Sequence, residues 1–424
     1  MYNISILYHQ LLKEHSKEEV DAIFDTELQK RNITDYEDFV KNYRREYNYE
    51  TIVKYIDLVS FFQLNIQNEF SEYLLENYIL NNQYLNLIYN YHCIQYVIEE
   101  YCKNVNNLTN EQLIYINSYI EICELNLSKN PNVTGKGLKS CENLQKLNLS
   151  YNRKIVKCDS FAHNIIELNL HGGSGISDIE LQKCINLQKL NLSRNMTISS
   201  FDSFSKTLIE LNIECNLIDD EALKNCVNLQ ILNANNNRFV TTCDPFCKSL
   251  LELDAIHNCT IDDKGLSNCN NLQKLNVKDN FKITTCAPFA KTLIDLNASW
   301  MCAIDEVGIQ NCNILQKLDA EENSKILSCD AFADTLIELN ASIDCGISDA
   351  GLKNCTNLKK LIVCGNRKIT TCSPFAKTLI ELNVQGNSYG IGDAGLQNCV
   401  NLQIPNFFHN YHAKRHVLLI VLCI

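Results

Sequence analysis

The sequence predicts an α/β solenoid with a parallel sheet along its concave face, preceded by an all-α N-terminal domain. Two observations predict it. A segment of about 43 residues repeats from residue 122 to residue 401, and a fixed period of this length indicates stacked supersecondary units. The first 121 residues differ in composition, because they hold 16 of the 19 tyrosines and none of the five prolines. The predicted division is a helical domain over 1–121, a solenoid over 122–401 and a degenerate tail over 402–424.

One cysteine marks each long repeat. The markers stand 42 to 44 residues apart, at Cys141, Cys184, Cys226, Cys269, Cys312, Cys355 and Cys399. Each long repeat contains two copies of the nine-residue frame L-x-x-L-x-L-x-x-N, so the true unit has 21 to 23 residues and about thirteen units follow one another. In one copy the frame is filled by Leu272, Leu275, Val277 and Asn280. The frame resembles that of leucine-rich repeat proteins, which implies a horseshoe with one short strand per coil.

Two kinds of coil alternate after the strand. One reads NFKITTCAPFA from residue 280, and its Ile283, Cys286 and Phe289 should point into the core. The other reads NCTIDDKGLSNC from residue 258, where Asp262 or Asp263 can cap a short helix. This second kind resembles the cysteine-containing repeats of F-box/LRR ubiquitin-ligase substrate receptors, through Cys259, Ile261, Asp263, Gly265, Leu266 and Cys269. The resemblance implies a substrate-recognition role, although residues 1–121 contain no F-box motif.

Helix signals fill the first 121 residues. Three capping boxes are present, Ser16 with Glu19, Thr34 with Glu37, and Thr109 with Gln112. These helices either cap the open end of the solenoid, as terminal repeats require, or form a docking module. At the other end the frame degrades at Pro405, so the tail either adds a closing strand or departs from the repeat.

Charge and hydropathy exclude several classes of partner. The net charge is −12 and no basic block is present, which argues against sequence-independent nucleic-acid binding. The longest late apolar run has eight residues, from Val417 to Ile424, far short of the ~20 that a membrane helix needs. The N-terminus lacks a basic segment followed by an apolar core, so no secretory signal is predicted. We therefore expect a cytoplasmic protein without a membrane span.

The 22 cysteines are interpreted as buried thiols. Twelve form two columns, the seven markers and Cys158, Cys243, Cys286, Cys329 and Cys372. Members of one column recur at best every second coil, about 10 Å apart, whereas a disulfide needs Cα atoms within about 7 Å. We expect free thiols in a reducing compartment. No metal site is predicted, because no CxxC pair or His–Cys cluster is present.

Two columns of the concave face are regular. Position three of the frame alternates between an acid and a lysine from Glu124 to Glu381, with Ile231 as the single break. Position five is asparagine except at Asp254, Asp319 and Ile362. On adjacent parallel strands the charges should pair, at about 0.2–1 kcal/mol for each exposed pair. Both columns are interpreted as structural.

Positions seven and eight vary, and they predict the partner-binding site. The densest set lies in the centre of the solenoid, at Ile256, His257, Lys278, Asp279, Trp300, Glu321 and Glu322. Trp300 is the only tryptophan, and tryptophan is enriched among interface hot spots. Alternatively, Trp300 packs over a gap left by Met301. Position nine is asparagine in ten of thirteen coils, and we expect distortion where Met301 or Gly173 replaces it.

No catalytic pattern fits the chain. HExxH and GKS/T are absent, and the nine histidines have no matched nucleophile. We expect a monomeric, non-catalytic scaffold that binds a partner protein on its concave face and needs no cofactor. The alternative is a substrate-recognition subunit of a ubiquitin ligase, with the helical domain docking the ligase core.

Overall fold

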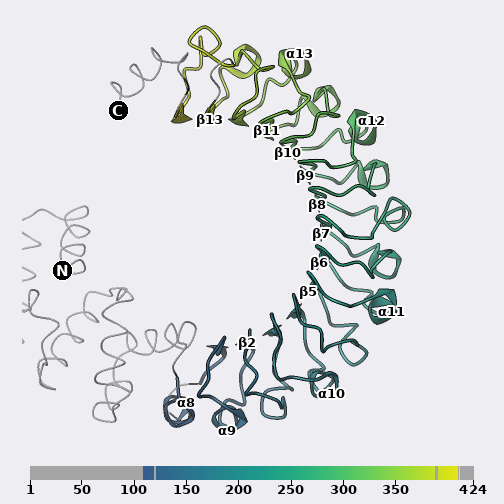
Figure 1. The fold of residues 1–424 in the computed structure, drawn as a ribbon, viewed down its shortest axis with the longest axis vertical. Helices are drawn as coiled ribbons and strands as arrows, with labels where there is room; N and C mark the ends of the chain where they lie inside the picture. The colour runs from purple at the N-terminus through teal and green to yellow at the C-terminus, as the bar shows by residue number, and fades with distance from the viewer. Residues whose placement is uncertain (1–107, 119–120, 387–389, 409, 411–424) are drawn as a thin grey trace, which may run out of the picture. The chain divides into compact units, whose positions relative to one another are not determined.

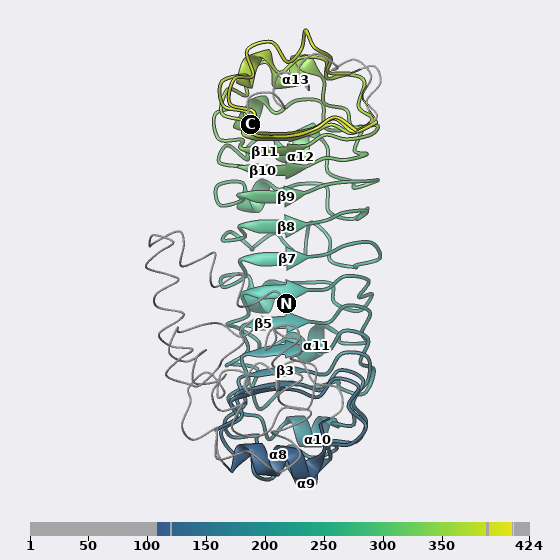
Figure 2. The ribbon, with the colours of Figure 1, turned by 90° about the vertical axis from the view of Figure 1, so that its left-hand side faces the viewer.

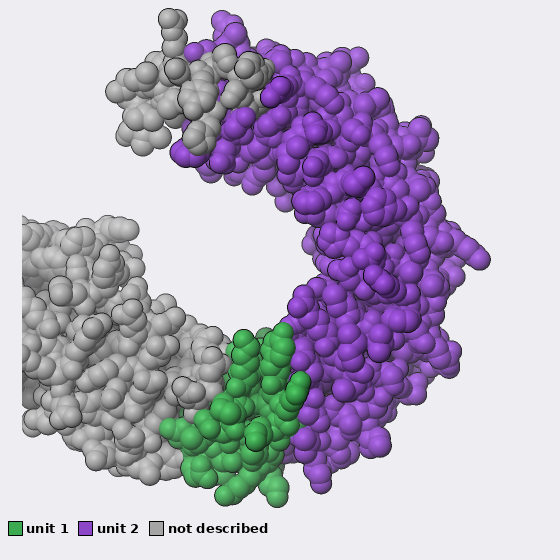
Figure 3. All heavy atoms as spheres, in the orientation of Figure 1, with its two compact units in different colours: residues 1–155 green, residues 156–424 purple. Residues whose placement is uncertain are grey.

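A computed structural model describes residues 108–118, 121–386, 390–408 and 410 of the chain (Figure 1). The chain forms two compact units, Met1–Ile155 and Val156–Ile424 (Figure 3). Most of the predicted helical domain, and the tail after residue 410, lie outside the described residues.

The described part of the first unit contains two helices and two strands. These are α8 (Asn110–Asn117), β1 (Glu124–Asn126), α9 (Gly135–Leu138) and β2 (Lys146–Asn148), and β1 pairs with β2 in parallel. The capping box at the start of α8 is confirmed. The Thr109 amide donates to Gln112 Oε1 at 2.9 Å, and the Gln112 amide donates to Thr109 Oγ1 at 3.3 Å. The two other predicted boxes lie outside the described residues.

The described part of the second unit contains twelve strands of three residues each, which pair in chain order and always in parallel. They are β3 (Glu167–Asn169), β4 (Lys189–Asn191), β5 (Glu210–Asn212), β6 (Ile231–Asn233), β7 (Glu252–Asp254), β8 (Lys274–Asn276), β9 (Asp295–Asn297), β10 (Lys317–Asp319), β11 (Glu338–Asn340), β12 (Lys360–Ile362), β13 (Glu381–Asn383) and β14 (Ile404–Asn406). Within this unit the strands follow the inner side of an arc (Figures 1 and 2).

The strand pattern confirms which face is buried. The central leucine points inward, as Leu275 shows with 2% exposure, while Lys274 beside it is exposed. Alternation along a strand therefore places positions three and five on the concave face. Residues 404–406 at the start of the predicted tail add a further strand to the sheet, because Leu382 of β13 pairs with Pro405 of β14.

Short helical turns cover the outer side of the second unit (Figure 1). The α-helices are α10 (Asp178–Leu181), α11 (Asp220–Leu223), α12 (Glu306–Ile309) and α13 (Asp349–Leu352), and the 3-10 helices are η2 (Asp244–Phe246), η3 (Ala287–Phe289), η4 (Asp330–Phe332) and η5 (Ser373–Phe375). Asp262 does cap its turn, accepting from the Gly265 amide at 2.9 Å. Asp263 instead joins two coils, because it accepts from the Thr284 amide at 2.8 Å and from its hydroxyl at 2.6 Å.

The core contains the residues that the repeat predicts. Ile283 and Cys286 are fully buried, and Phe289 is 1% exposed. The same phenylalanine position recurs along the unit and supplies six of its seven largest fully buried side chains among the described residues, at Phe161, Phe204, Phe246, Phe289, Phe332 and Phe375. A stack of this kind gives every interior coil a core shared with its two neighbours.

Asparagine at position nine joins each coil to the one before it. Asn280 is fully buried; its Nδ2 donates to the Ala255 carbonyl at 2.7 Å, and its Oδ1 accepts from the amides of Lys282 and Ile283 at 2.8 and 3.1 Å. Such a side chain satisfies buried backbone groups on both sides of the turn.

In four coils the buried side chain that corresponds to the position-nine asparagine stands one residue later, at position ten. Asn258, Met301 and Asp344 are exposed at position nine, and the next residue of each coil is a buried cysteine, at Cys259, Cys302 and Cys345. The Ile304 amide donates to Cys302 Sγ at 3.4 Å, in the way that an asparagine oxygen would accept. After Gly173 the buried residue is Ser174. Asn258 is one of the ten position-nine asparagines counted from the sequence, and its expected equivalence to Asn280 was therefore wrong. The distortion expected at Met301 and Gly173 takes the form of this shift.

The two cysteine columns lie against one another. Thiols on neighbouring coils influence one another in five pairs, Cys158 with Cys184, Cys243 with Cys269, Cys286 with Cys312, Cys329 with Cys355 and Cys372 with Cys399. The partner thiol and burial raise the pKa of the first cysteine in each pair. The sequence predicted distances only within a column, so this contact was missed. Every described cysteine is a thiol, and most are buried.

Candidate protein-binding face

The charge ladder at position three is present in the second unit. The ion pairs join Lys189 to Glu210 at 2.9 Å, Lys274 to Glu252 at 2.6 Å, Lys317 to Glu338 at 2.8 Å, and Lys360 to Glu381 at 3.0 Å. All of these side chains are at least one-third exposed, so solvent screens them and each pair contributes little to stability. The pairs mainly neutralise the concave surface along most of its length.

The ladder leaves one acid without an ion pair. Ile231 faces Glu252 across the sheet, so Glu252 takes Lys274 on its other side. Lys317 pairs forward with Glu338, and Asp295, which lies between Lys274 and Lys317, has no ion pair within the described residues. Burial raises the pKa of Asp295, while the two lysines act in the opposite direction.

The side chain at position five forms a hydrogen bond just past the end of its strand. The side-chain oxygen of Asn297 accepts from the Ser299 amide at 3.0 Å, and the same bond recurs at most strands. The Ile256 amide, which follows Asp254, instead donates to Asn235 Oδ1 of the neighbouring coil at 2.7 Å. The structural interpretation of this column therefore holds. Burial raises the pKa of Asp254, and a hydrogen bond from Asn276 lowers it.

Position eight has a left-handed backbone in every described coil of the second unit. The φ angles lie between 52° and 72° at Gly172, Arg194, Cys215, Asn236, His257, Asp279, Trp300, Glu322, Ile343, Gly365 and Gly386. This conformation was not predicted, although the three glycines at this position were a signal for it. It is uncommon for bulky and β-branched residues, so Trp300 at 63° and Ile343 at 59° are held there by the coil around them.

The central set contains two contacts between adjacent coils. His257 Nδ1 lies 2.9 Å from Asp279 Oδ2, and Lys278 Nζ lies 4.4 Å from the centre of the Trp300 ring. Trp300 is 42% exposed despite this cation–π contact. An ammonium over a tryptophan face is stabilised by about 0.5–1 kcal/mol at an exposed site.

The gap over which Trp300 could have packed is not there. Met301 is 69% exposed, and Cys302 is buried in the position that an asparagine occupies in other coils. The premise of that alternative is wrong, and the exposed part of the Trp300 ring is available to solvent.

The other predicted site residues complete the same region. Ile256 is half-buried, Glu321 is half-buried and Glu322 is exposed. The Glu321 carbonyl accepts from the Trp300 amide at 2.6 Å, which places the acid on the coil beside the ring. Neither glutamate has an ion pair within the part of the chain that the structure describes.

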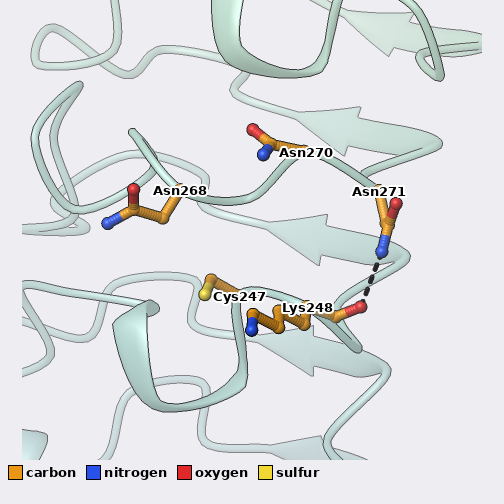
Figure 4. Close-up of a pocket in the computed structure, with 5 residues that line it drawn as sticks. All are labelled: Cys247, Lys248, Asn268, Asn270 and Asn271. Carbon is orange, nitrogen blue, oxygen red and sulfur yellow. Dashed lines mark hydrogen bonds between the residues drawn. The ribbon is translucent and has the colours of Figure 1, made fainter.

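A hollow of about 340 Å³ lies elsewhere on the second unit, lined by Cys247, Lys248, Asn268, Asn270 and Asn271 (Figure 4). Asn271 Nδ2 donates to the Lys248 carbonyl at 2.7 Å, as equivalent asparagines do in other coils. The lining carries no acid–base or nucleophile pair, and burial raises the pKa of the Cys247 thiol. We assign no chemistry to it.

Within residues 108–410 as described, no set of three or more metal-binding side chains is placed to hold an ion. No helix in the same residues is long and apolar enough to cross a bilayer.

Comparisons with solved structures find similar folds. A leucine-rich repeat protein of Leptospira interrogans has a TM-score of 0.50 at 19% identity, over 76% of this chain and 92% of that one. The chain has a leucine-rich repeat fold. An internalin of Listeria monocytogenes has a TM-score of 0.46 at 22% identity, over 74% of this chain and 87% of that one. No protein-family model and no curated protein matches the leucine-rich repeat chain described here.

Proposed function

We propose that the chain is a non-catalytic scaffold that binds a partner protein on the concave face of its second unit, centred on Trp300. The observation that carries the proposal is the partly exposed Trp300 ring, on a left-handed residue, in a surface where most position-three charges are paired and most position-five side chains bond the ends of their strands. A large aromatic side chain in such a place is a typical binding hot spot.

The surrounding surface supports a binding role over a catalytic one. The position-five side chains are occupied with strand ends, and most position-three charges are paired along the sheet. The central set brings together His257 with Asp279, but none of its seven residues supplies a hydroxyl or thiol nucleophile to complete them. Variation of positions seven and eight on a fixed scaffold is a means of choosing a partner.

The test compares two variants of the full chain, one at Trp300 and a matched control. Trp300→Ala should weaken the binding of a captured partner by about 2 kcal/mol or more, which is a roughly 30-fold increase in Kd. Tyr151→Ala is the control, since Tyr151 is also an exposed position-eight aromatic with a lysine, Lys129, over its ring at 5.6 Å. Tyr151→Ala should leave the affinity unchanged. A lower melting temperature with unchanged affinity in Trp300→Ala would instead assign the ring a structural role.

The same capture experiment examines the ubiquitin-ligase alternative. Recovery of ligase core subunits with both the wild-type chain and Trp300→Ala would show docking through another surface and favour that alternative. We also place the protein in a reducing compartment, because its paired buried thiols are better suited to one.

A further inference from the structure

The unpaired acids of the concave face gather at its centre. Five carboxylates on or just after strands β7 to β10 take part in no ion pair among the described residues, namely Asp254, Asp295, Asp319, Glu321 and Glu322. Each described ladder lysine from β4 to β12, within this region and on both sides of it, is already matched by a glutamate. The centre therefore carries excess negative charge that the chain itself does not neutralise.

The one central lysine outside these pairs lies on the tryptophan. Lys278 follows β8, and its ammonium sits over the Trp300 ring at 4.4 Å. The ring therefore holds a cation, supplied by the chain itself, at the edge of the acidic region. The arrangement of a ring face beside carboxylates is the chemistry that retains guanidinium and ammonium groups.

Apolar side chains border the region at the strand exits. Phe281 and Met301 are 61% and 69% exposed, and the Ala303 amide donates to the Asn280 carbonyl at 2.8 Å, which holds the two loops together. Ile343 is also exposed, two coils beyond Trp300. A partner that lies across the face meets carboxylates on the strands and apolar groups at their ends.

Resting on the proposed function, we propose that the partner segment is cationic and that one of its arginine or lysine side chains takes the place of Lys278 on Trp300. Lys278 then acts as an internal competitor. Its removal frees the ring and also leaves the carboxylates with one cation fewer. A partner cation then contacts both the Trp300 ring and the carboxylates. Without a partner, the protein without the Lys278 ammonium keeps its charge ladder and its fold.

The experiment uses Trp300 itself as the reporter, because it is the only tryptophan in the chain. The full-length protein is titrated with a tryptophan-free peptide of four arginines spaced by serine and leucine, and with the same peptide carrying glutamate in place of arginine. We expect the arginine peptide alone to change Trp300 fluorescence saturably, with weaker binding at higher salt. The double variant Glu321→Gln, Glu322→Gln should bind the arginine peptide about fivefold or more weakly.

Lys278→Met distinguishes the proposal from general charge attraction. It should tighten the arginine peptide about two- to fivefold, since the internal cation–π contact no longer competes. Lys360→Met is the matched control, because it removes the same charge from the same face, where Lys360 pairs with Glu381 away from Trp300. The control should change the affinity less than twofold.

Three outcomes would overturn the inference: no response to the arginine peptide, an equal response to the glutamate peptide, or weaker binding in Lys278→Met. Preference for the glutamate peptide would leave the concave scaffold role standing with a partner of opposite charge. The scaffold role itself fails only if Trp300→Ala leaves partner capture unchanged.

Discussion

At the scale of single residues, the left-handed position eight is the most demanding feature of the repeat. Eleven described coils of the second unit share it, and only three of them use glycine there. An L-residue in this region is destabilised by about 1–2 kcal/mol relative to a right-handed conformation. The repeat tolerates this cost because the position-eight amide itself donates to a carbonyl of the next coil, as the Ile343 amide does to the Cys364 carbonyl at 2.7 Å.

Ile343→Gly should therefore stabilise the fold. Ile343 is β-branched, 42% exposed and at φ 59°, so glycine relieves strain while removing little buried surface. The larger conformational entropy of glycine in the unfolded state offsets part of this relief. We therefore expect a net gain of about 0.5–1 kcal/mol in the free energy of unfolding. Urea denaturation measures it. Ile343→Ala keeps the strain and should show no gain; equal gains for both variants would contradict the backbone explanation.

At the scale of the coil, glycine sets how closely neighbours approach. A Cβ built on Gly265 would lie 2.2 Å from the Thr241 carbonyl oxygen, and the same clash recurs at Gly308, Gly351 and Gly395. The Gly265 carbonyl accepts from the Cys243 amide at 2.9 Å, so the two coils are also bonded where they touch. The glycine in the cysteine-containing coils is thus explained by packing.

Gly265→Ala should destabilise the protein by about 1–3 kcal/mol, because the added methyl group meets backbone and must push the coils apart. Gly135→Ala is the matched control in α9, where nothing lies within 4 Å of the added Cβ. That change should be neutral or slightly stabilising, since alanine favours a helix. Thermal unfolding of both variants checks the pair; similar losses in each would refute the close-approach account.

At the scale of the whole molecule, the buried thiols connect stability to pH. Burial raises the pKa of Cys259, Cys302 and Cys345 from 9.0 to about 11. A raised acid pKa in the folded state means that the unfolded chain loses its protons first as pH rises. The stability that these thiols contribute is complete below pH 9 and is lost as pH rises from 9 through 11.

We expect the urea midpoint to be constant between pH 7 and pH 8.5 and to fall steeply above pH 9. Each such thiol contributes a slope of about 1.4 kcal/mol per pH unit in that window. Hydrogen bonds to glutamate raise the pKa of Lys274 and Lys317, so loss of charge from these ladder lysines also lowers stability as the pH rises through the upper part of this window. Repeating the series in 1 M salt screens those pairs and leaves the thiol contribution. A midpoint unchanged up to pH 11 would show that the thiols are not buried.

The central contacts illustrate how much of the candidate site was predictable. A fixed period places equivalent positions on adjacent coils, so Lys278 and Trp300, or His257 and Asp279, were expected as neighbours and are in contact. Whether this set binds a partner is still a prediction. That Asp295 is left without an ion pair among the described residues could not be predicted, because it depends on which neighbouring glutamate each lysine pairs with across the sheet.

The sequence by itself determined the period, the buried leucine of each strand, the phenylalanine core and the charge ladder, because each follows from a residue type repeated in one frame. Only the tertiary structure decided the left-handed position eight, the shift of the ladder from Asn258 to Cys259 and the contact between Cys243 and Cys269. These depend on how one coil rests on the next. A one-dimensional period states that two coils are neighbours, but packing and hydrogen bonding between them set the path of the turn.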